Sequence, residues 1–506
     1  MDQQQKGQDG SISSKDELGK IKDQRLVRLD AYVKGKWVSA TGNKRFEVTD
    51  PGTHQTLGHV ADMDAYDVSK AVDAASDAFG EWSKTTAKKR ASLLRKWYDL
   101  IVANTDDLAR LLTLECGKPF TEAAGEVDYG ASYIEWFAEE AKRVNGDVLP
   151  ITNNNSRMVV LKQPVGVVGV VTPYNFPSAM ITRKVSAALA AGCTVVIRPA
   201  RETPFSALAL CELAERAGIP PGVFNVVPCS KENTPEVGKE LTTNPKIRKV
   251  SFTGSTNVGK LLMSQASSTM KKISMELGGN APFIVFEDAS IHEAAEQLLF
   301  CKFRNSGQTC VCANRIYVHD KIYDEFVSVF TSLVKEKLCI GHGLAPSTNF
   351  GPMITNHGLA KTEEHLQRAV KAGAKVVVGG KRANIEAGGD FFEPTVLVNV
   401  NNDVPMTCEE TFSPLCPIYR FSSEEDVVRC ANNVSVGLAG YFFSRDVGRI
   451  IRVAESLEVG VVGVNTGSIE SEVAPFGGVK QSGVGREGSR YGIDDYLNIK
   501  YLNVVF

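Results

Sequence analysis

The stretch Phe303-Arg-Asn-Ser-Gly-Gln-Thr-Cys-Val-Cys312 places Cys310 in a polar turn directly after an apolar, helix-like run over 294–300. A cysteine in such a turn is a candidate nucleophile, because its thiolate is strongly nucleophilic even when only partly ionised. The chain has 11 cysteines, so the spacing alone also fits a buried structural residue. Three further stretches favour the nucleophile: Pro173-Tyr-Asn-Phe-Pro177, Met275-Glu-Leu-Gly-Gly279 and Glu409-Glu-Thr-Phe-Ser-Pro414.

Strands and helices alternate on both sides of this stretch. Apolar runs typical of buried strands fall at 165–171, 194–198, 223–227, 248–252, 282–286, 315–318, 375–378, 417–421 and 461–464, with helical patterns such as 179–190 and 291–303 between them. This alternation predicts an α/β fold with doubly wound parallel sheets. A chain of 506 residues is too long for one ordinary core, so we expect two or more domains.

The bulk properties exclude several partners. A formal net charge of −2 argues against nucleic acid, and no apolar run is long enough to predict a membrane-spanning helix. The cysteines are scattered without a paired C-x2-C, which argues for a reducing compartment and against a metal site. Residues 1–25 are polar and rich in acids, unlike a targeting segment. We therefore expect a disordered tail over 1–25 and a cytoplasmic protein.

A glycine-rich segment, Gly254 to Lys260, fits the beginning of a phosphate-binding loop, G-x-x-x-x-G-K. The next residue is Leu261, where a nucleoside triphosphatase needs a serine or threonine to hold Mg²⁺. The alternative is a strand–turn–helix whose backbone N–H groups hold a dinucleotide pyrophosphate at the helix N-terminus.

Together, these stretches resemble the NAD(P)-dependent aldehyde dehydrogenases, from about residue 32 to 501. Asn175 to Lys184, Cys310 to Cys312 and Pro475 to Gly483 are similar to the members that oxidise succinate semialdehyde, the fungal ones in particular. The resemblance implies two doubly wound α/β domains and a small β oligomerisation element, and hence a homodimer or homotetramer. The expected ranges are a dinucleotide-binding domain at 26–142 and 163–277, a catalytic domain at 278–479, and the oligomerisation element at 143–162 and 480–506.

The resemblance assigns the catalytic roles. Cys310 would attack the aldehyde to give a thiohemiacetal, with Asn175 and the Cys310 backbone N–H as oxyanion donors; losing one such donor costs about 2.7–4 kcal/mol of barrier. Hydride would then leave for the nicotinamide, and water would hydrolyse the thioester with Glu276 as general base. Lys184 would take part in proton relay. Cys312 is either a structural cysteine or the partner of Cys310 in a reversible, inactivating disulfide.

The same resemblance implies cofactor contacts from Thr172, Tyr174, Gly254, Ser255, Val258, Glu410 and Phe412. Arg198-Pro-Ala-Arg201 departs from the family, which usually has lysine first and, in NAD-preferring members, often glutamate fourth. Two guanidinium groups can pair with a 2′-phosphate, and no carboxylate at the fourth position repels it. We therefore predict that NADP⁺ is favoured over NAD⁺, the alternative being that Arg201 faces solvent.

Two arginines indicate the substrate. Arg183 and Arg304 match the family positions that hold a carboxylate at the far end of a short semialdehyde. The family would also offer a serine from the loop over 466–471, but an ungapped match places Glu470 there, with Ser471 beside it. We expect Ser471 to substitute, or Glu470 to face outward or pair with an arginine. Glutarate semialdehyde and a broader aldehyde range stay open. A non-catalytic structural role is disfavoured, because the nucleophile, the base and the oxyanion donor are all present.

Overall fold

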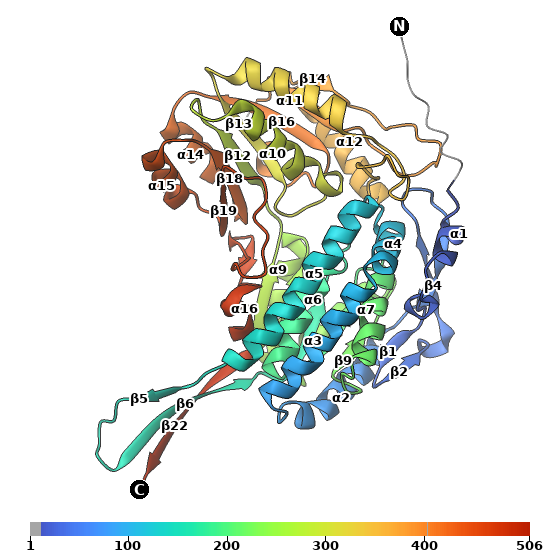
Figure 1. Cartoon of the computed structure of the whole chain (residues 1–506), viewed down its shortest axis with the longest axis vertical. Coiled ribbons are helices and arrows are strands. Elements are labelled where there is room, and N and C mark those ends of the chain that lie inside the picture. Colours follow the sequence, from blue (N-terminus) through green and yellow to red (C-terminus); the bar gives the residue numbers. More distant parts are fainter. Residues whose placement is uncertain (1–11, 402) are drawn as a thin grey trace.

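The computed structural model describes residues 12–401 and 403–506. Two α/β units lie one above the other, and a narrow sheet extends from the lower, larger unit beside the C-terminus (Figure 1). The larger unit contains an eight-stranded sheet in the order β2-β1-β9-β8-β7-β10-β11-β21. Its strands are β1 Ala31–Val33, β2 Lys36–Val38, β7 Val167–Val171, β8 Thr194–Arg198, β9 Phe224–Val226, β10 Ile247–Thr253, β11 Lys272–Glu276 and β21 Gly483–Val484. The five strands β7 to β11 run parallel, as predicted.

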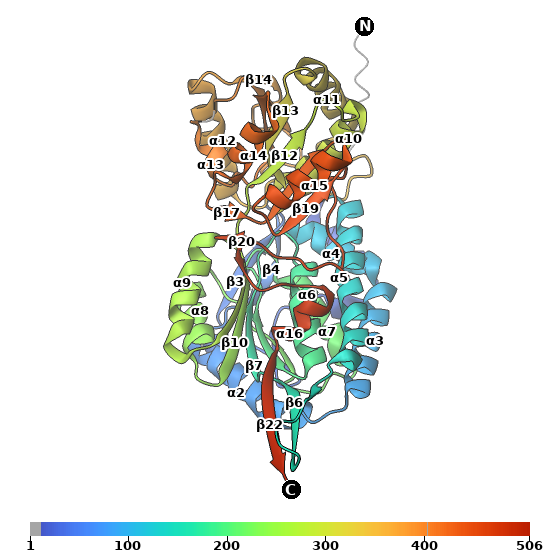
Figure 2. The same cartoon turned by 90° about the vertical axis from the view of Figure 1, so that its left-hand side faces the viewer.

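Helices cover both faces of this sheet. Figure 2 shows α8 and α9 on one side and α3 to α7 on the other, and α2 joins the first group by packing on β7, β8 and α8. The helices are α2 Ala65–Trp82, α3 Ala87–Ala103, α4 Thr105–Cys116, α5 Phe120–Glu140, α6 Ala179–Ala191, α7 Pro204–Arg216, α8 Thr234–Thr243, α9 Thr256–Ala266 and α16 Ser489–Asp494. A hairpin of β3 Arg45–Thr49 and β4 Thr56–Ala61 lies outside the main sheet.

The smaller unit repeats the doubly wound plan. Its seven-stranded sheet has the order β14-β15-β16-β13-β12-β18-β19, and every pairing except β14–β15 is parallel. The strands are β12 Ala281–Val285, β13 Ala313–His319, β14 Lys375–Val378, β15 Thr395–Val398, β16 Leu415–Phe421, β18 Ala439–Phe443 and β19 Val461–Val464. The helices are α10 Ile291–Phe303, α11 Tyr323–Lys337, α12 Asn356–Lys371, α13 Pro405–Cys408, α14 Glu424–Asn432 and α15 Val447–Ser456. A short ladder between β17 Val436–Gly437 and β20 Val479–Lys480 lies beside it.

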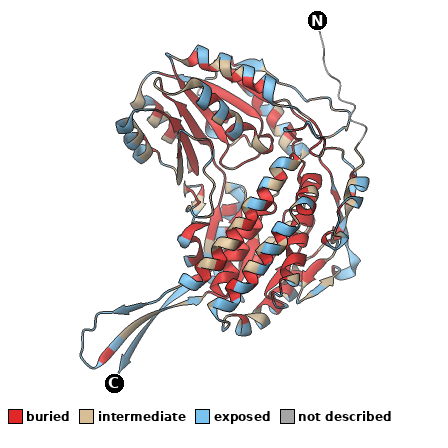
Figure 3. Cartoon of the chain, in the orientation of Figure 1, coloured by how far each residue is buried: buried red, intermediate tan, exposed pale blue. Residues whose placement is uncertain are grey.

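Both sheets are buried on two faces, whereas the extending sheet is largely exposed (Figure 3). This third sheet has the order β22-β6-β5, with β5 Asp147–Leu149, β6 Ser156–Pro164 and β22 Leu497–Val505. The predicted oligomerisation element differs from the structure over 480–496. There, β21 pairs with β11 of the main sheet and α16 packs on α5 and α6, so only the last strand reaches the extending sheet.

The prediction of a disordered tail over 1–25 is wrong for the part from Ser14 onward; residues 1–11 lie outside the described residues. Helix α1, Ser14–Gly19, is held by a hydrogen bond of 2.7 Å from Ser14 Oγ to the buried Asp50 carboxylate and by an ion pair between Glu17 and Arg110. Ser14 and Glu17 therefore have specific partners in the folded domain, which a count of charges does not reveal.

No helix within residues 12–401 and 403–506 combines the length and apolar character needed to span a bilayer. In the same part of the chain, no cluster of three or more acidic, histidine or cysteine side chains is arranged to hold a metal ion.

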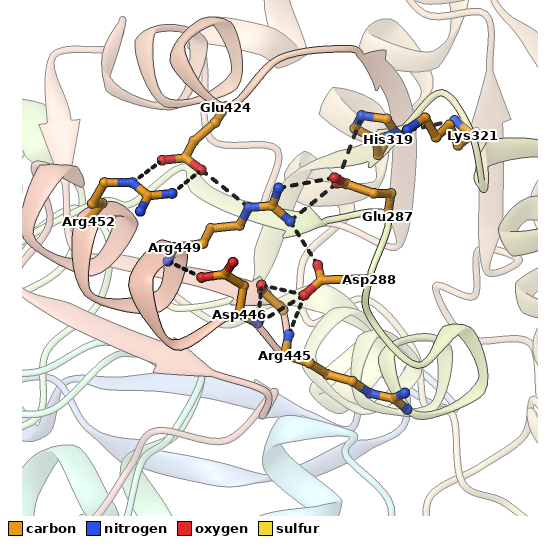
Figure 4. Close-up of polar contacts among 10 residues, drawn as sticks. Glu287, Asp288, His319, Lys321, Glu424, Arg445, Asp446, Arg449 and Arg452 are labelled. Carbon is orange, nitrogen blue, oxygen red and sulfur yellow. Dashed lines mark hydrogen bonds and ion pairs between the residues drawn. The ribbon is translucent and has the colours of Figure 1, made fainter.

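An ion-pair cluster on the smaller unit joins the end of β12 to α14 and α15 (Figure 4). Arg449 contacts Glu287 at 3.0 Å, Asp288 at 2.8 Å and Glu424 at 3.2 Å, and Arg452 contacts Glu424 at 2.9 Å. Burial alone would raise the pKa of Glu287 and Asp288, but hydrogen bonds outweigh it and lower the pKa of both. For Glu424 the hydrogen bond from Arg452 is the largest cause of a lowered pKa.

Replacing Arg449 by alanine is expected to lower the free energy of unfolding by about 1–3 kcal/mol, because it leaves partly buried carboxylates without their shared partner. Carboxylates with a lowered folded pKa contribute stability above their ordinary pKa and lose it as the pH falls. Denaturant unfolding at pH 7 and at about pH 3, below the ordinary pKa of these carboxylates, should therefore show a larger Arg449→Ala effect at the higher pH. Arg445→Ala is the matched control, since only its backbone N–H contacts Asp288 (Figure 4). An equal loss in both variants would contradict the prediction.

Candidate active site

The predicted nucleophile lies on the loop between α10 and β13, directly after a sharp turn. Asn305, Ser306 and Gly307 all have left-handed backbone conformations, with φ of 50°, 55° and 78°. A Cβ atom at Gly307 would lie 2.3 Å from the carbonyl oxygen of Ser413, so this close approach requires glycine. The turn reverses the chain after α10 and brings Cys310 to a cavity, where it is partly exposed.

This cavity has a volume of about 390 Å³. Next to Cys310 it is lined by Thr309, Val311, Phe176 and Phe476. Its charged lining comprises three cations and three carboxylates: Lys118, Arg183, Arg304, Glu122, Glu126 and Glu470. The cavity therefore contains both predicted substrate arginines, but each has an acidic partner.

Glu276 ends β11 and is buried, with 4% of its surface exposed. Its Oε2 accepts hydrogen bonds from Arg183 Nη2 at 2.8 Å and from Thr253 Oγ1 at 3.1 Å. Burial raises its pKa, and the charge of Arg183 partly opposes that shift. Burial also raises the pKa of the Cys310 thiol well above its usual value, and the Glu276 carboxylate raises it further. The raised pKa values favour the protonated, neutral forms of both groups. Cys310 therefore has to lose its proton to a base before it can attack.

Lys184 reaches the same network from α6. Its Nζ donates to Thr253 Oγ1 at 2.6 Å, and Thr253 in turn donates to Glu276. This chain of hydrogen bonds gives a route between Lys184 and the predicted base, and the relay role stays a prediction.

The network also contains Glu487, which sequence reasoning missed. Its carboxylate pairs with Lys184 and, at 2.6 Å, with Arg183 Nη2. The two cations outweigh the effect of burial and lower the pKa of Glu487. Glu487 follows Gly485-Arg486 near the C-terminus, and nothing in that local sequence indicates a buried partner more than 300 residues away.

Asn175 is buried immediately beside the nucleophile loop. Its Nδ2 donates to the carbonyl of Gln308 at 3.0 Å, two residues before Cys310. Its own backbone carbonyl accepts from Lys118 Nζ at 2.8 Å and from Asn305 Nδ2 at 3.0 Å. Lys118 and Asn305 therefore position Asn175, a function that the sequence did not indicate. The oxyanion role of Asn175 stays a prediction.

The cofactor residues predicted from the first sheet gather at one edge. Strands β8, β7, β10 and β11 are adjacent and parallel, so their carboxyl ends bring Arg198, Thr172, Gly254 and Glu276 together. The order of strands reverses direction between β7 and β10, which is where open α/β sheets bind ligands.

The turn after β10 is the predicted pyrophosphate site. Ser255 caps α9 by accepting from the Val258 N–H, and the first turn of this helix is exposed. Exposed N–H groups at a helix N-terminus suit a phosphate group. Lys260, the lysine of the apparent phosphate-binding loop, instead donates to Gln481 at 2.8 Å. Its amino group is thus already hydrogen-bonded within the protein.

The second unit supplies the other predicted cofactor residues through the loop before β16. Glu410 accepts from the Gly279 N–H at 3.0 Å, and burial raises the pKa of Glu410 to about 7. Phe412 lies edge-on to Tyr174, with ring centroids 6.3 Å apart. A Cβ atom at Gly279 would lie 2.4 Å from the Cys310 carbonyl oxygen, so this glycine lets the chain after Glu276 pass against the nucleophile loop.

The two unusual arginines point to different partners. Arg198 donates to Thr234 Oγ1 at 2.6 Å and contacts the Cys229 sulfur at 3.2 Å. Arg201 pairs with its neighbour Glu202 at 2.7 Å, with 42% of its side chain exposed. It lines a second cavity together with Ser230 and Lys231. Arg201 shares this cavity with a hydroxyl and a lysine, groups that suit a phosphate. The lining also includes carboxylates: Glu47, Glu115, Glu202, Glu232 and Asp390.

Of the alternatives for the loop over 466–471, the ion pair is the one the structure shows. Glu470 lines the cavity and pairs with Arg304 Nη2. Ser471 does not line it, and its hydroxyl contacts Glu472 at 3.4 Å. The structure thus shows the pairing of Glu470 with an arginine, and the substrate role of Ser471 stays a prediction.

Cys312 is buried two residues after the nucleophile. Its sulfur lies 3.4 Å from Lys302 Nζ and 3.4 Å from the Lys302 carbonyl oxygen, and it is unbonded to Cys310. Cys310 borders the cavity while Cys312 faces Lys302, so a disulfide requires one side chain to turn. The redox role stays a prediction.

Comparison with known proteins agrees with this geometry. The aldehyde dehydrogenase family model matches residues 37–502, and the chain belongs to the aldehyde dehydrogenase family. A succinate-semialdehyde dehydrogenase (NADP⁺) of Escherichia coli is 54% identical over 96% of this chain and 99% of its own. A glutarate-semialdehyde dehydrogenase of Pseudomonas aeruginosa is also 54% identical, over 95% of this chain and 99% of its own.

A solved structure is equally similar. The succinate-semialdehyde dehydrogenase of Burkholderia pseudomallei superimposes with a TM-score of 0.94 at 54% identity, covering 96% of this chain and 100% of that one. The predicted fold, two doubly wound α/β domains with a small β element, is thereby confirmed.

Proposed function

We propose that this enzyme oxidises succinate semialdehyde to succinate with NADP⁺, or with NAD⁺, through a thiohemiacetal and a thioester on Cys310. The observation that carries the proposal is the cavity in which Cys310 lies with Arg183 and Arg304. Relatives at 54% identity that carry the name of this activity support it. The carboxyl edge of the first sheet and the exposed first turn of α9 fit the dinucleotide, which when bound accepts the hydride.

The residues of the chain account for the other steps. Glu276, with its pKa raised by burial, takes the proton of the Cys310 thiol, whose own pKa is raised as well. The thiolate adds to the aldehyde carbon, and Asn175 with the Cys310 N–H stabilises the oxyanion. Hydride departure leaves a thioester, and the proton taken from the thiol passes from Glu276 to solvent. Glu276 then removes a proton from water, which attacks the thioester, so that the Cys310 thiolate leaves and the acid is released. Lys184 and Thr253 connect Glu276 to a proton route.

The test is a set of initial rates with succinate semialdehyde and propanal, each with NADP⁺ and NAD⁺. Oxidation of the semialdehyde well above that of propanal supports the proposal, because only the acid can contact the arginines. Equal rates would reduce the proposal to a broad aldehyde dehydrogenase. Glutarate semialdehyde belongs in the same series, since a relative named for it is as similar as those named for succinate semialdehyde.

We expect Arg201→Glu to lower the ratio of kcat/KM for NADP⁺ over NAD⁺ by roughly 10- to 100-fold, because a charge-assisted contact to the 2′-phosphate would be replaced by repulsion. Lys231, which lines the same cavity, provides a second substitution at the proposed phosphate site. Lys335 is an exposed residue of α11 in the smaller unit and does not line this cavity, so Lys335→Glu gives the matched change of charge. An unchanged ratio in Arg201→Glu would show that the Arg201 side chain contacts only solvent and Glu202, and not the cofactor.

We further propose a homodimer or homotetramer assembled through the β22-β6-β5 sheet. Apolar side chains on this sheet are strongly exposed: Val148 is 78% exposed, Ile499 76% and Phe506 78%. An edge strand with exposed apolar side chains is suited to pairing with another chain. A cytoplasmic location is proposed on the eleven free cysteines, which suit a reducing compartment.

A further inference from the structure

The distal part of the cavity contains an ion pair that competes for the predicted substrate contact. Arg304 Nη2 pairs with Glu470, and the two side chains are 21% and 12% exposed. The Arg304 guanidinium lies 5.3 Å from the ring centres of both Phe176 and Phe300. These contacts hold the cation in place and leave Glu470 beside any group that approaches it.

The Arg183 guanidinium is also paired with carboxylates of the protein. Its Nε and Nη2 contact Glu487 and Glu276, so within the described residues only Nη1 has no acceptor. Lys118, the remaining cation of the cavity, pairs with Glu126. Each cation of the lining thus already has a carboxylate partner, and the cavity is not a site of net positive charge.

A carboxylate bound at Arg304 must lie near the Glu470 carboxylate, and two like charges that share a partly buried site repel each other. A neutral carboxamide of the same shape meets no such repulsion. Its oxygen can accept from Arg304 while its NH₂ group donates to Glu470. The pair of Arg304 and Glu470 therefore offers a donor and an acceptor side by side.

We propose that Glu470 is a specificity-determining residue that occupies Arg304, and so reduces the preference for aldehydes ending in a carboxylate over neutral aldehydes of the same length. The inference rests on the proposed function, because it concerns the same cavity. The neutral substrate class comprises short aldehydes whose far end both donates and accepts hydrogen bonds.

The experiment compares succinate semialdehyde with its neutral isostere 4-oxobutanamide in the full-length enzyme and in Glu470→Gln and Glu470→Ser. The ratio of kcat/KM for the acid over the amide should rise at least tenfold in both variants. Most of the change should be a lower KM for the acid, because the repulsion acts in the bound ground state as well as in the transition state. The inhibition constant of succinate against 4-oxobutanamide oxidation should fall in parallel.

The control is Glu472→Gln, which removes a carboxylate from the same loop without altering the cavity lining. Its acid-to-amide ratio should stay that of the unmodified enzyme. If Glu470 instead serves only to orient Arg304, both Glu470 variants will show an unchanged or lower ratio and weaker inhibition by succinate, and the inference is overturned. An unmodified enzyme that oxidises neither aldehyde would overturn the proposed function itself. Activity on both without a response to Glu470 would overturn this inference alone.

Discussion

Replacing Cys310 by alanine is expected to reduce kcat for aldehyde oxidation by at least about 10⁴-fold, the scale on which enzymes lose activity without their nucleophile. An aldehyde can lose hydride only after a nucleophile has added to it, and alanine offers none. Cys310 borders the cavity, whereas the nearby Cys301 and Cys312 are buried. Among the described residues, no other thiol lines the cavity and could take over.

The measurement is the rate of NADPH formation together with the dissociation constant for NADP⁺. Because the proposed cofactor residues lie on other strand ends and loops, the dissociation constant should change by less than about tenfold. Cys339 is an exposed cysteine remote in sequence from this loop, so Cys339→Ala tests the loss of a thiol as such. Retained activity in Cys310→Ala would show that the reaction proceeds without a covalent enzyme intermediate.

Periodic patterns in the sequence predicted most of the framework. Strands over 194–198 and 461–464 and the helix over 291–303 occur within a residue of their expected bounds. Apolar runs broken by turn residues are local signals, so the chain need not be folded to recognise them. Cys310 and Glu276 could also be proposed as site residues from the sequence, because each lies in a short motif.

What escaped prediction depends on contacts between distant segments. Glu487 and β21 join the first unit from the far end of the chain, and only the folded topology brings them to Arg183 and β11. Ser14 and Glu17 looked like part of a polar tail because their partners, Asp50 and Arg110, lie elsewhere in the sequence. A charged residue can be classed as exposed or paired only once its partner is known.

The two α/β units lie one above the other (Figure 1), and the site takes residues from both. The carboxyl ends of parallel strands in the first unit supply Glu276 and the cofactor edge. The loops before β13 and β16 in the second unit supply Cys310 and Glu410. Gly279 lies where the chain crosses between the units, against the Cys310 carbonyl. The residues proposed for substrate oxidation thus come from both sheets of the chain.

Glu276→Gln is expected to lower the steady-state kcat by roughly 10²- to 10⁴-fold, the usual contribution of a general base. Glutamine keeps the shape and can still accept from Arg183, but it cannot take a proton. In the proposed mechanism Glu276 serves both thiol deprotonation and thioester hydrolysis, and hydride departs between these two steps. Mixing enzyme, NADP⁺ and aldehyde should therefore give a slowed burst of NADPH of at most one per active site, followed by a still slower phase. Added hydroxylamine should speed the slow phase by cleaving the thioester directly.

The pH dependence gives an independent test of the same base. The pKa of Glu276 is raised by burial, and the group acts in its deprotonated form. In the unmodified enzyme kcat/KM should therefore fall as the pH drops through this raised pKa and recover above it. In Glu276→Gln, the fall of kcat/KM caused by protonation of Glu276 should disappear. Only the change of kcat/KM with ionisation of the Cys310 thiol, whose pKa is also raised, should remain. Two results would show that another residue is the base. One is a pH profile of kcat/KM in Glu276→Gln equal to that of the unmodified enzyme, and the other is a slow phase whose rate hydroxylamine does not change.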